Sequence, residues 1–211
     1  MKRPVLVLLS VLMLGLVAGC TEKVTSTVAV NSPDYSTLPE KKQTKLGLYL
    51  TAAEAYDNWK ADPENIVVLD VRTPEEYIFV GHPEMAWNVP FKIATCETVD
   101  GQPGLVMKTT PDFIERAKKV VKPTDTIYVI CRSGGRSAAV VNLLAEKGFK
   151  NAYNIIDGFE GDKVKDPKNA NHGKRAINGW RNAGRPWTYD LVPEKMLLPA
   201  EILKPEAPKT E

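Results

Sequence analysis

The sequence predicts an α/β domain of three layers, in which helices cover both faces of a central, mostly parallel β-sheet. Short apolar runs alternate with helical patterns along the middle of the chain, which is typical of this fold class. The run Ile66–Leu69 is apolar at every position, as expected of a strand buried on both faces of a parallel sheet. At residues 128–147 a β-branched run passes through a glycine-rich loop directly into a helical pattern. Such units present functional groups at the carboxyl edge of a sheet.

The length of 211 residues suits one domain with tails. We expect a signal segment at 1–20, a flexible tether at 21–46, a folded domain at 47–190 and a proline-rich tail at 191–211. The 16 prolines gather near the ends, which indicates extended tails around a compact centre. The 28 basic and 26 acidic residues nearly balance, so the charge composition gives no reason to expect a nucleic-acid partner.

The N-terminus has the pattern of a targeting segment. Residues 1–3 carry positive charge, and residues 5–17 form an apolar run too short to span a bilayer comfortably. The sequence at 17–20, Val-Ala-Gly-Cys, resembles a bacterial lipoprotein signal, which implies lipidation of Cys20. Thr21 in place of Asp slightly favours the outer membrane. We therefore expect an exported protein that a lipid anchors to a membrane facing the periplasm. Ordinary secretory cleavage and an uncleaved anchor remain the alternatives.

Local signals predict the elements that precede the glycine-rich loop. Thr51 and Glu54 have the spacing of a capping box at the start of a helix that runs to about Lys60. Thr73 followed by Pro74 is the expected start of a short second helix. The other elements expected here are strands at 66–69 and 86–91, an irregular surface insertion at 95–109, and a helix from Thr110-Pro111 to Val121.

After the loop, Gly148 suits the position that follows the end of a helix at 138–147. The remaining expected elements are a strand at 153–156, a turn at 157–161, a charged loop at 162–173 and a last helix at 175–183.

The glycine-rich loop is centred on Cys131. Two glycines let the backbone turn several N–H groups toward one point, and the helix that follows adds the positive end of its dipole. Each of these effects, like the charge of a nearby arginine, favours thiolate over thiol, so Cys131 is the candidate nucleophile. The alternative is a buried structural cysteine whose neighbouring arginines pair with surface carboxylates. The candidate anion-binding residues are Arg132, Ser133, Gly134, Gly135, Arg136 and Ser137.

Other chemically capable residues are few. Asp70 and Arg72 end a strand that should neighbour the strand before Cys131, where they form either a charged pocket wall or an internal ion pair. With two histidines and no Cys-x-x-Cys motif, we expect neither a metal site nor a cofactor. Of these histidines, His82 follows a glycine in a turn, where capping of the backbone is its expected role. Cys96 lies in the insertion and is interpreted as a surface cysteine or as a resolving thiol.

Four segments resemble, in order, the motifs of the single-domain rhodanese family. Together they span about residues 48–190, and the cysteine loop combined with the upstream Asp-Val-Arg segment is the specific part. The chain departs from the family pattern at residues 81–88, and it exceeds a minimal rhodanese at 95–109 and 161–174. The four segments are LDVRTPEEY at 69–77, GHPEMAWNVP at 81–90, ICRSGGRS at 130–137, and DGF at 157–159 with GWRNAGRPW at 179–187.

This resemblance implies sulfur transfer through a persulfide on Cys131. The partners would be a small anionic sulfur donor such as thiosulfate and an acceptor that is cyanide, a thiol or a protein. A non-catalytic sulfur-carrier or binding module is the first alternative. A cysteine phosphatase or arsenate reductase is less favoured, because Cys-x5-Arg would require arginine where Ser137 stands. Arg136 gives Cys-x4-Arg instead, a shorter loop that should fit a sulfane sulfur better than phosphate.

Overall fold

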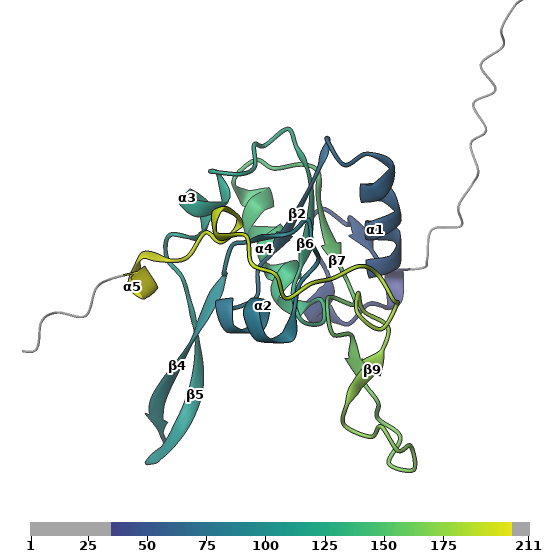
Figure 1. The fold of residues 1–211 in the computed structure, drawn as a ribbon, viewed down its shortest axis with the longest axis vertical. Helices are drawn as coiled ribbons and strands as arrows, with labels where there is room; N and C mark the ends of the chain where they lie inside the picture. Colours follow the sequence, from purple (N-terminus) through teal and green to yellow (C-terminus); the bar gives the residue numbers. More distant parts are fainter. Residues whose placement is uncertain (1–34, 204–211) are drawn as a thin grey trace, which may run out of the picture. The chain divides into compact units, whose positions relative to one another are not determined.

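The computed structural model describes residues 35–203, and these contain a five-stranded parallel sheet with helices on both faces (Figure 1). The strand order is β1-β7-β6-β2-β3, and every neighbouring pair is parallel. The predicted fold class is therefore confirmed. The elements are η1 (Tyr35–Thr37), η2 (Glu40–Lys42), β1 (Tyr49–Leu50), α1 (Ala52–Ala61), β2 (Ile66–Asp70), α2 (Pro74–Val80), β3 (Trp87–Asn88), β4 (Lys92–Val99), β5 (Gln102–Thr109), α3 (Phe113–Ala117), β6 (Thr126–Ile130), α4 (Gly135–Glu146), β7 (Ala152–Ile155), β8 (Asp162–Lys163), β9 (Arg175–Ile177), η3 (Pro193–Lys195) and α5 (Ala200–Leu203).

The central strand β6 shows how the layers form. Successive side chains of a strand point to opposite faces, so β6 contributes to two separate apolar clusters. Ile127 and Val129 pack with residues of α3 and α4 on one face. Tyr128 and Ile130 pack with α1 and Trp180 on the other. Both faces of the sheet are therefore covered, which explains the continuous apolar runs in the sequence.

The predicted capping box at Thr51 is present, and a second capping box starts at Thr73. Thr51 accepts the N–H of Glu54 at the start of α1, and Glu54 in turn accepts the N–H of Thr51. Thr73 and Glu76 form the same reciprocal pair at the start of α2. The predicted residue after the end of α4 is also confirmed, since Gly148 has φ of +87° and its N–H bonds to the carbonyl of Ala145.

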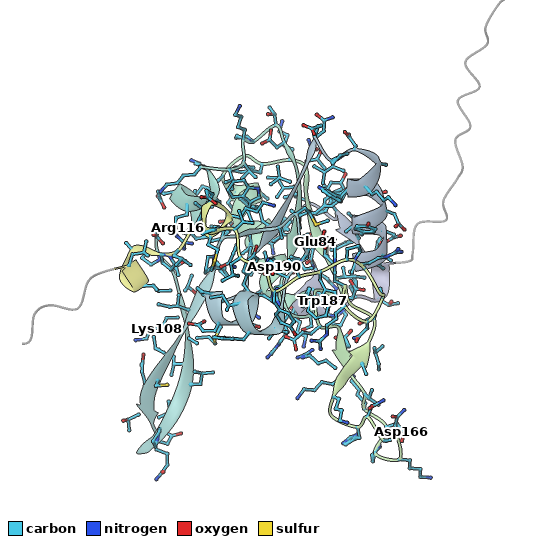
Figure 2. All side chains as sticks on the ribbon, in the orientation of Figure 1. Glu84, Lys108, Arg116, Asp166, Trp187 and Asp190 are labelled. Carbon is cyan, nitrogen blue, oxygen red and sulfur yellow. The ribbon has the colours of Figure 1, made fainter. Side chains whose placement is uncertain are left out.

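The insertion at 95–109 is an ordered hairpin, so its prediction as an irregular segment was wrong. Strands β4 and β5 pair antiparallel from Lys92↔Thr109 to Val99↔Gln102 and extend away from the sheet (Figure 1). Figure 2 labels Lys108 on this arm. Pro103 and Gly104 suggested irregular structure, but each strand of a two-stranded ribbon is an edge strand, where proline is tolerated.

The last predicted helix, at 175–183, is also wrong. Residues 175–177 form β9, which pairs antiparallel with β8 in the segment expected to be a charged loop. Asn178 and Gly179 have φ of +48° and +85°, and a Cβ on Gly179 would lie 2.4 Å from the backbone nitrogen of Gly161. A helix cannot continue through two left-handed residues, so the close approach of these two backbones fixes a turn instead.

The helix predicted from Thr110 is shorter than expected. α3 covers only Phe113–Ala117, and Asp112 precedes it without a side-chain cap. Thr110 instead donates its hydroxyl to the carbonyl of Pro90 at 3.0 Å, and it accepts a hydrogen bond from Arg116. Its side chain therefore ties the base of the β4–β5 hairpin to the sheet rather than starting a helix.

The packed part of the chain extends N-terminal of residue 47. The carbonyl of Lys42 accepts a hydrogen bond from Asn154 in β7, and its ammonium lies 3.2 Å from the Asp162 carboxylate. At the other end, the Leu197 N–H bonds to the carbonyl of Asn88, and Trp187 (Figure 2) packs edge-on against Phe159.

Residues 1–34 and 204–211, with the predicted signal segment, lie outside the described part. Within 35–203, no helix has the length and apolar character needed to cross a bilayer.

Candidate active site

Cys131 directly follows β6, the strand at the centre of the parallel sheet, and three residues separate it from α4. Its neighbour β2 is in register with β6, so Asp70 lies opposite Ile130. The carboxyl ends of parallel strands meet at one edge of a sheet, which brings the Asp-Val-Arg segment next to the cysteine. This placement was expected from the sequence and is confirmed.

The backbone of the loop is fixed by two glycines. Gly134 has φ of +92°, and a Cβ there would lie 2.1 Å from the carbonyl oxygen of Ile156. Gly158 has φ of +64°, and its Cβ would lie 2.5 Å from the carbonyl oxygen of Cys131. By contrast, a Cβ on Gly135 would make only an ordinary 3.7 Å contact. The turn after β7 therefore holds the cysteine loop at a distance that admits no side chain at 134 or 158.

Two polar groups face the sulfur of Cys131. The N–H of Gly134 donates to Sγ at 3.2 Å, and Oγ of Ser137 lies 3.3 Å from the same atom. Gly134 is also the residue before α4, so the sulfur lies at the positive end of that helix. The backbone N–H groups of the first helical turn have no acceptor within the helix, which leaves them free to bind an anion. Ser133 is half-buried within the loop.

Asn154 controls the hydroxyl of Ser137. Its Nδ2 donates to the carbonyls of Lys42 and Gly134, which places Oδ1 toward Ser137 Oγ at 2.6 Å. A hydroxyl has one proton, and Oδ1 can only accept, so Ser137 donates to Asn154 at the 2.6 Å contact while its oxygen lies 3.3 Å from the Cys131 sulfur. Asn154 therefore sets the orientation of the hydroxyl that lies beside the sulfur.

Arg136 pairs with a carboxylate rather than facing open space. Its two terminal nitrogens each donate to a different oxygen of Glu76 at 2.6 Å, and both side chains are 18% exposed. Burial alone would raise the pKa of Glu76, but the hydrogen bonds and charge of Arg136 outweigh it and lower this pKa below its ordinary value. Of the two roles considered for Arg136, the structure shows the ion pair with a carboxylate.

A cavity of about 710 Å³ opens beside the loop. Three parts of the chain contribute to it: the start of α2, the β4–β5 hairpin and the cysteine loop. Cys131 is only 1% exposed and does not itself line the cavity, whereas the arginines on its C-terminal side do. The lining residues are Thr73, Glu75, Glu76, Lys92, Ala94, Leu105, Met107, Arg132 and Arg136.

Asp70 and Arg72 form an internal ion pair. Both side chains are fully buried, and Arg72 Nε donates to both carboxylate oxygens of Asp70 at 2.9 and 3.0 Å. Arg72 also donates to the carbonyl of Gly81, and its guanidinium lies 4.3 Å from the centre of the Phe159 ring. Neither residue lines the cavity, so of the two roles considered for them the structure shows the structural one.

The other candidates lie away from the sulfur. His82 is buried and stacked on Tyr77, with ring centres 3.5 Å apart. Burial lowers its pKa below the ordinary value, and the hydrogen bond to the Tyr77 carbonyl offsets this only in part. Cys96 is an exposed free cysteine on β4. Among residues 35–203, no cluster of three metal-ligating side chains occurs. Cys20 lies outside the described residues.

Glu76 and Asn154 were missed as site residues by the sequence reasoning. The Thr73-x-x-Glu76 spacing was a visible capping-box signal, but it gave no indication of a contact with Arg136, 60 residues away. Asn154 had one available signal, because it is a polar residue inside an otherwise apolar strand. When such a residue is buried, its side-chain amide needs hydrogen-bond partners.

The fold and site define a class: a parallel α/β domain with a cysteine in a glycine-rich loop between its central strand and a helix. Comparison with known proteins identifies the family. A sequence profile described as "Rhodanese-like domain" matches residues 51–165. The chain belongs to the rhodanese-like domain family.

Three relatives illustrate the range of this similarity. An uncharacterized protein of Rickettsia rickettsii is 30% identical over 142 residues, which cover 66% of this chain and 96% of the relative. Thiosulfate sulfurtransferase 16 of Arabidopsis thaliana chloroplasts is 38% identical over 91 residues, 43% of this chain and 68% of the relative. The crystal structure of Rv0390 from M. tuberculosis matches with a TM-score of 0.50 and 28% identity, covering 67% of this chain and 96% of that one.

Proposed function

We propose that the protein is a sulfurtransferase that carries a sulfane sulfur on Cys131. The observation that supports this most directly is the position of the Cys131 sulfur, which accepts the N–H of Gly134 at the positive end of α4. That environment stabilises a thiolate, and it equally stabilises the terminal charge of a persulfide. The similarity to a thiosulfate sulfurtransferase at 38% identity supports the same reaction class.

The reaction has two steps. The Cys131 thiolate attacks the outer sulfur of thiosulfate, the S–S bond breaks, and its electron pair leaves with sulfite. A persulfide anion then remains on Cys131. An acceptor such as cyanide or a thiolate attacks the terminal sulfur and restores the Cys131 thiolate. The backbone N–H groups at the start of α4 hold the charge of the persulfide, and Arg132 attracts the anionic donor.

The test is thiocyanate formation from thiosulfate and cyanide by the purified chain, together with intact-protein mass spectrometry. We expect a mass increase of one sulfur atom after thiosulfate is added, reversal by cyanide, and loss of both signals in Cys131→Ser. Cys96→Ser is the matched control, because this second thiol is exposed on the hairpin. A persulfide that persists in Cys131→Ser and disappears in Cys96→Ser would falsify the assignment of the nucleophile.

A non-catalytic module is the second candidate, and the burial of the Cys131 thiol at 1% exposure favours it. A substrate must reach this sulfur through the loop residues that line the cavity. Absence of a persulfide with thiosulfate, mercaptopyruvate and polysulfide would leave this second function. Hydrolysis of a phosphate ester that depends on Cys131 would instead support a phosphatase.

We further propose that the protein is exported and anchored by a lipid on Cys20, facing the periplasm. The support is the positive, apolar and small-residue pattern of residues 1–20. Expression in a bacterium fed a clickable fatty acid should label the wild type and not Cys20→Ala. Label on both proteins, or on neither, would argue against the anchor.

A further inference from the structure

The β4–β5 hairpin directs alternate side chains toward the cavity. Ala94 pairs with Met107 across the hairpin, and Cys96 pairs with Leu105. Directly paired residues share one face of an antiparallel ribbon, and neighbouring residues along a strand point to opposite faces. Ala94, Leu105 and Met107 all line the cavity beside the cysteine loop. One face of the hairpin therefore forms an apolar wall of the site.

Within residues 35–203, no other part of the chain covers this wall. Leu105 is 70% exposed and Met107 is 37% exposed, although each faces the cavity. Scattered exposed apolar residues are common, but here they gather at the opening of the candidate active site. Figure 1 shows the hairpin extending beside α2, and the first residues of α2 line the same cavity.

The charges in the cavity favour an anion. Glu76 and Arg136 neutralise each other through their bidentate pair. Lys92 and Arg132 form no ion pair with any residue of the described range 35–203. Besides Glu76, the only carboxylate that lines the cavity is that of Glu75, so these two positive charges are set against one negative charge. The lining thus has an excess of one positive charge, which suits a ligand with one negative charge.

The cavity is also larger than an inorganic donor requires. Its volume of about 710 Å³ lies within the range typical of sites that enclose organic ligands with both apolar and polar parts. Thiosulfate is a small, wholly polar dianion and leaves the Leu105 and Met107 side chains in water. An apolar chain next to them would remove that surface from water, which is favourable.

We infer that the sulfur donor of this site is an organic sulfane-sulfur monoanion with an apolar chain, an inference that rests on the sulfur transfer proposed above. The anionic end lies at Arg132, close to Cys131, and the chain lies along Leu105 and Met107. An alkanethiosulfonate, R–SO₂–S⁻, is a probe of this class. The Cys131 thiolate attacks its terminal sulfur, the S–S bond breaks, and the electron pair leaves with the sulfinate R–SO₂⁻. Charge and atoms balance without a proton, an oxidant or a reductant.

The experiment compares methane-, butane- and hexanethiosulfonate as donors for the full chain, with cyanide as acceptor. We expect kcat/KM to rise about two- to fourfold for each added methylene. The upper figure corresponds to ~0.8 kcal/mol for a fully buried CH₂, and the lower to a chain in contact on one side only. In the double variant Leu105→Ser/Met107→Ser, this dependence on chain length should disappear.

The matched control is Val99→Ser. Val99 is an exposed apolar residue of the same hairpin, but it lies on the face opposite to Leu105 and does not line the cavity. It should keep the chain-length dependence of the wild type. A flat series in the wild type, with thiosulfate still turned over, overturns the inference and leaves the proposed function intact.

A binding measurement separates the inference from the proposed function. If no donor, thiosulfate included, forms a persulfide, sulfur transfer itself is refuted. Titration calorimetry of the sulfinates R–SO₂⁻ into Cys131→Ser then tests the cavity without any chemistry. Affinity that increases with chain length, and that is lost in the Leu105/Met107 variant, supports the ligand class. Affinity that is absent or independent of chain length overturns it.

Discussion

Replacing Glu76 with glutamine should destabilise the protein by about 2–3 kcal/mol. The substitution removes one charge from a partly buried pair in which Arg136 makes two hydrogen bonds of 2.6 Å. A hydrogen bond to a charged group contributes about 1.5–3 kcal/mol. The two bonds between Arg136 and Glu76 join the same two groups, so their energies do not add fully. Glutamine keeps an oxygen that can accept the N–H of Thr73, so the cap of α2 is retained.

Urea unfolding of a double-mutant cycle measures this energy, with Glu76→Gln, Arg136→Gln and the double variant. The coupling should be about 2 kcal/mol. Glu54→Gln is the matched control, because Glu54 has the same capping role at the start of α1 and forms no ion pair with any of residues 35–203. It should cost less than about 1 kcal/mol. If both glutamines cost the same, the Glu76–Arg136 pair does not stabilise the loop, and the reasoning is refuted.

The stability that the Glu76 carboxylate contributes should depend on pH in a definite direction. The pKa of Glu76 is lowered in the folded protein, so the stability that its carboxylate contributes is present above the ordinary value of 4.5. That contribution is lost as the pH falls below 4.5 toward the folded-state pKa. The stability difference between wild type and Glu76→Gln should therefore be constant from pH 7 to about 5 and should shrink below it. A difference that grows on acidification would contradict the ion pair.

Three further substitutions test the loop. Gly134→Ala should destabilise by more than about 2 kcal/mol in urea unfolding, because a Cβ meets Ile156, whereas Gly148→Ala, with φ of +87° and open space, should cost about 1 kcal/mol. Asn154→Ala should cost about 2–4 kcal/mol in the same assay, since it leaves the buried carbonyl of Lys42 without its donor, removes one of the two donors to the carbonyl of Gly134, and takes away the acceptor of the Ser137 hydroxyl. Arg132→Ala should raise KM for thiosulfate about fivefold with little change in kcat, as steady-state kinetics will show.

The parts of the site that the sequence predicted are those governed by local rules. The strand, the cysteine and the following helix are contiguous, so their geometry follows from residues 128–147 alone. The capping box at Thr51 follows from a three-residue spacing, and the proximity of Asp70 to Cys131 follows from the arrangement of parallel strands. None of these needs knowledge of which distant side chains meet.

The parts that were not predicted depend on contacts distant in sequence. Glu76 and Arg136 are 60 residues apart, and nothing local distinguishes this pairing from an arginine that faces solvent. The hairpin at 92–109 was missed because its pairing occurs between two edge strands, which tolerate residues that suggest a loop elsewhere. The turn after β9 depends on the approach of Gly161 and Gly179, which only the assembled fold reveals.

The pairing of Arg136 also bears on the choice between sulfur and phosphate. A tetrahedral oxyanion is best bound by a guanidinium that donates two hydrogen bonds to it. Both terminal nitrogens of Arg136 are engaged by Glu76, so a phosphate dianion would have to displace that carboxylate and leave it partly buried and unpaired. A persulfide has a single terminal atom and needs only the N–H groups of the loop and of the first turn of α4. The Glu76–Arg136 pair therefore supports the proposed sulfur transfer over phosphate chemistry, and in that proposal Arg132 is the group that contacts the leaving part of the donor.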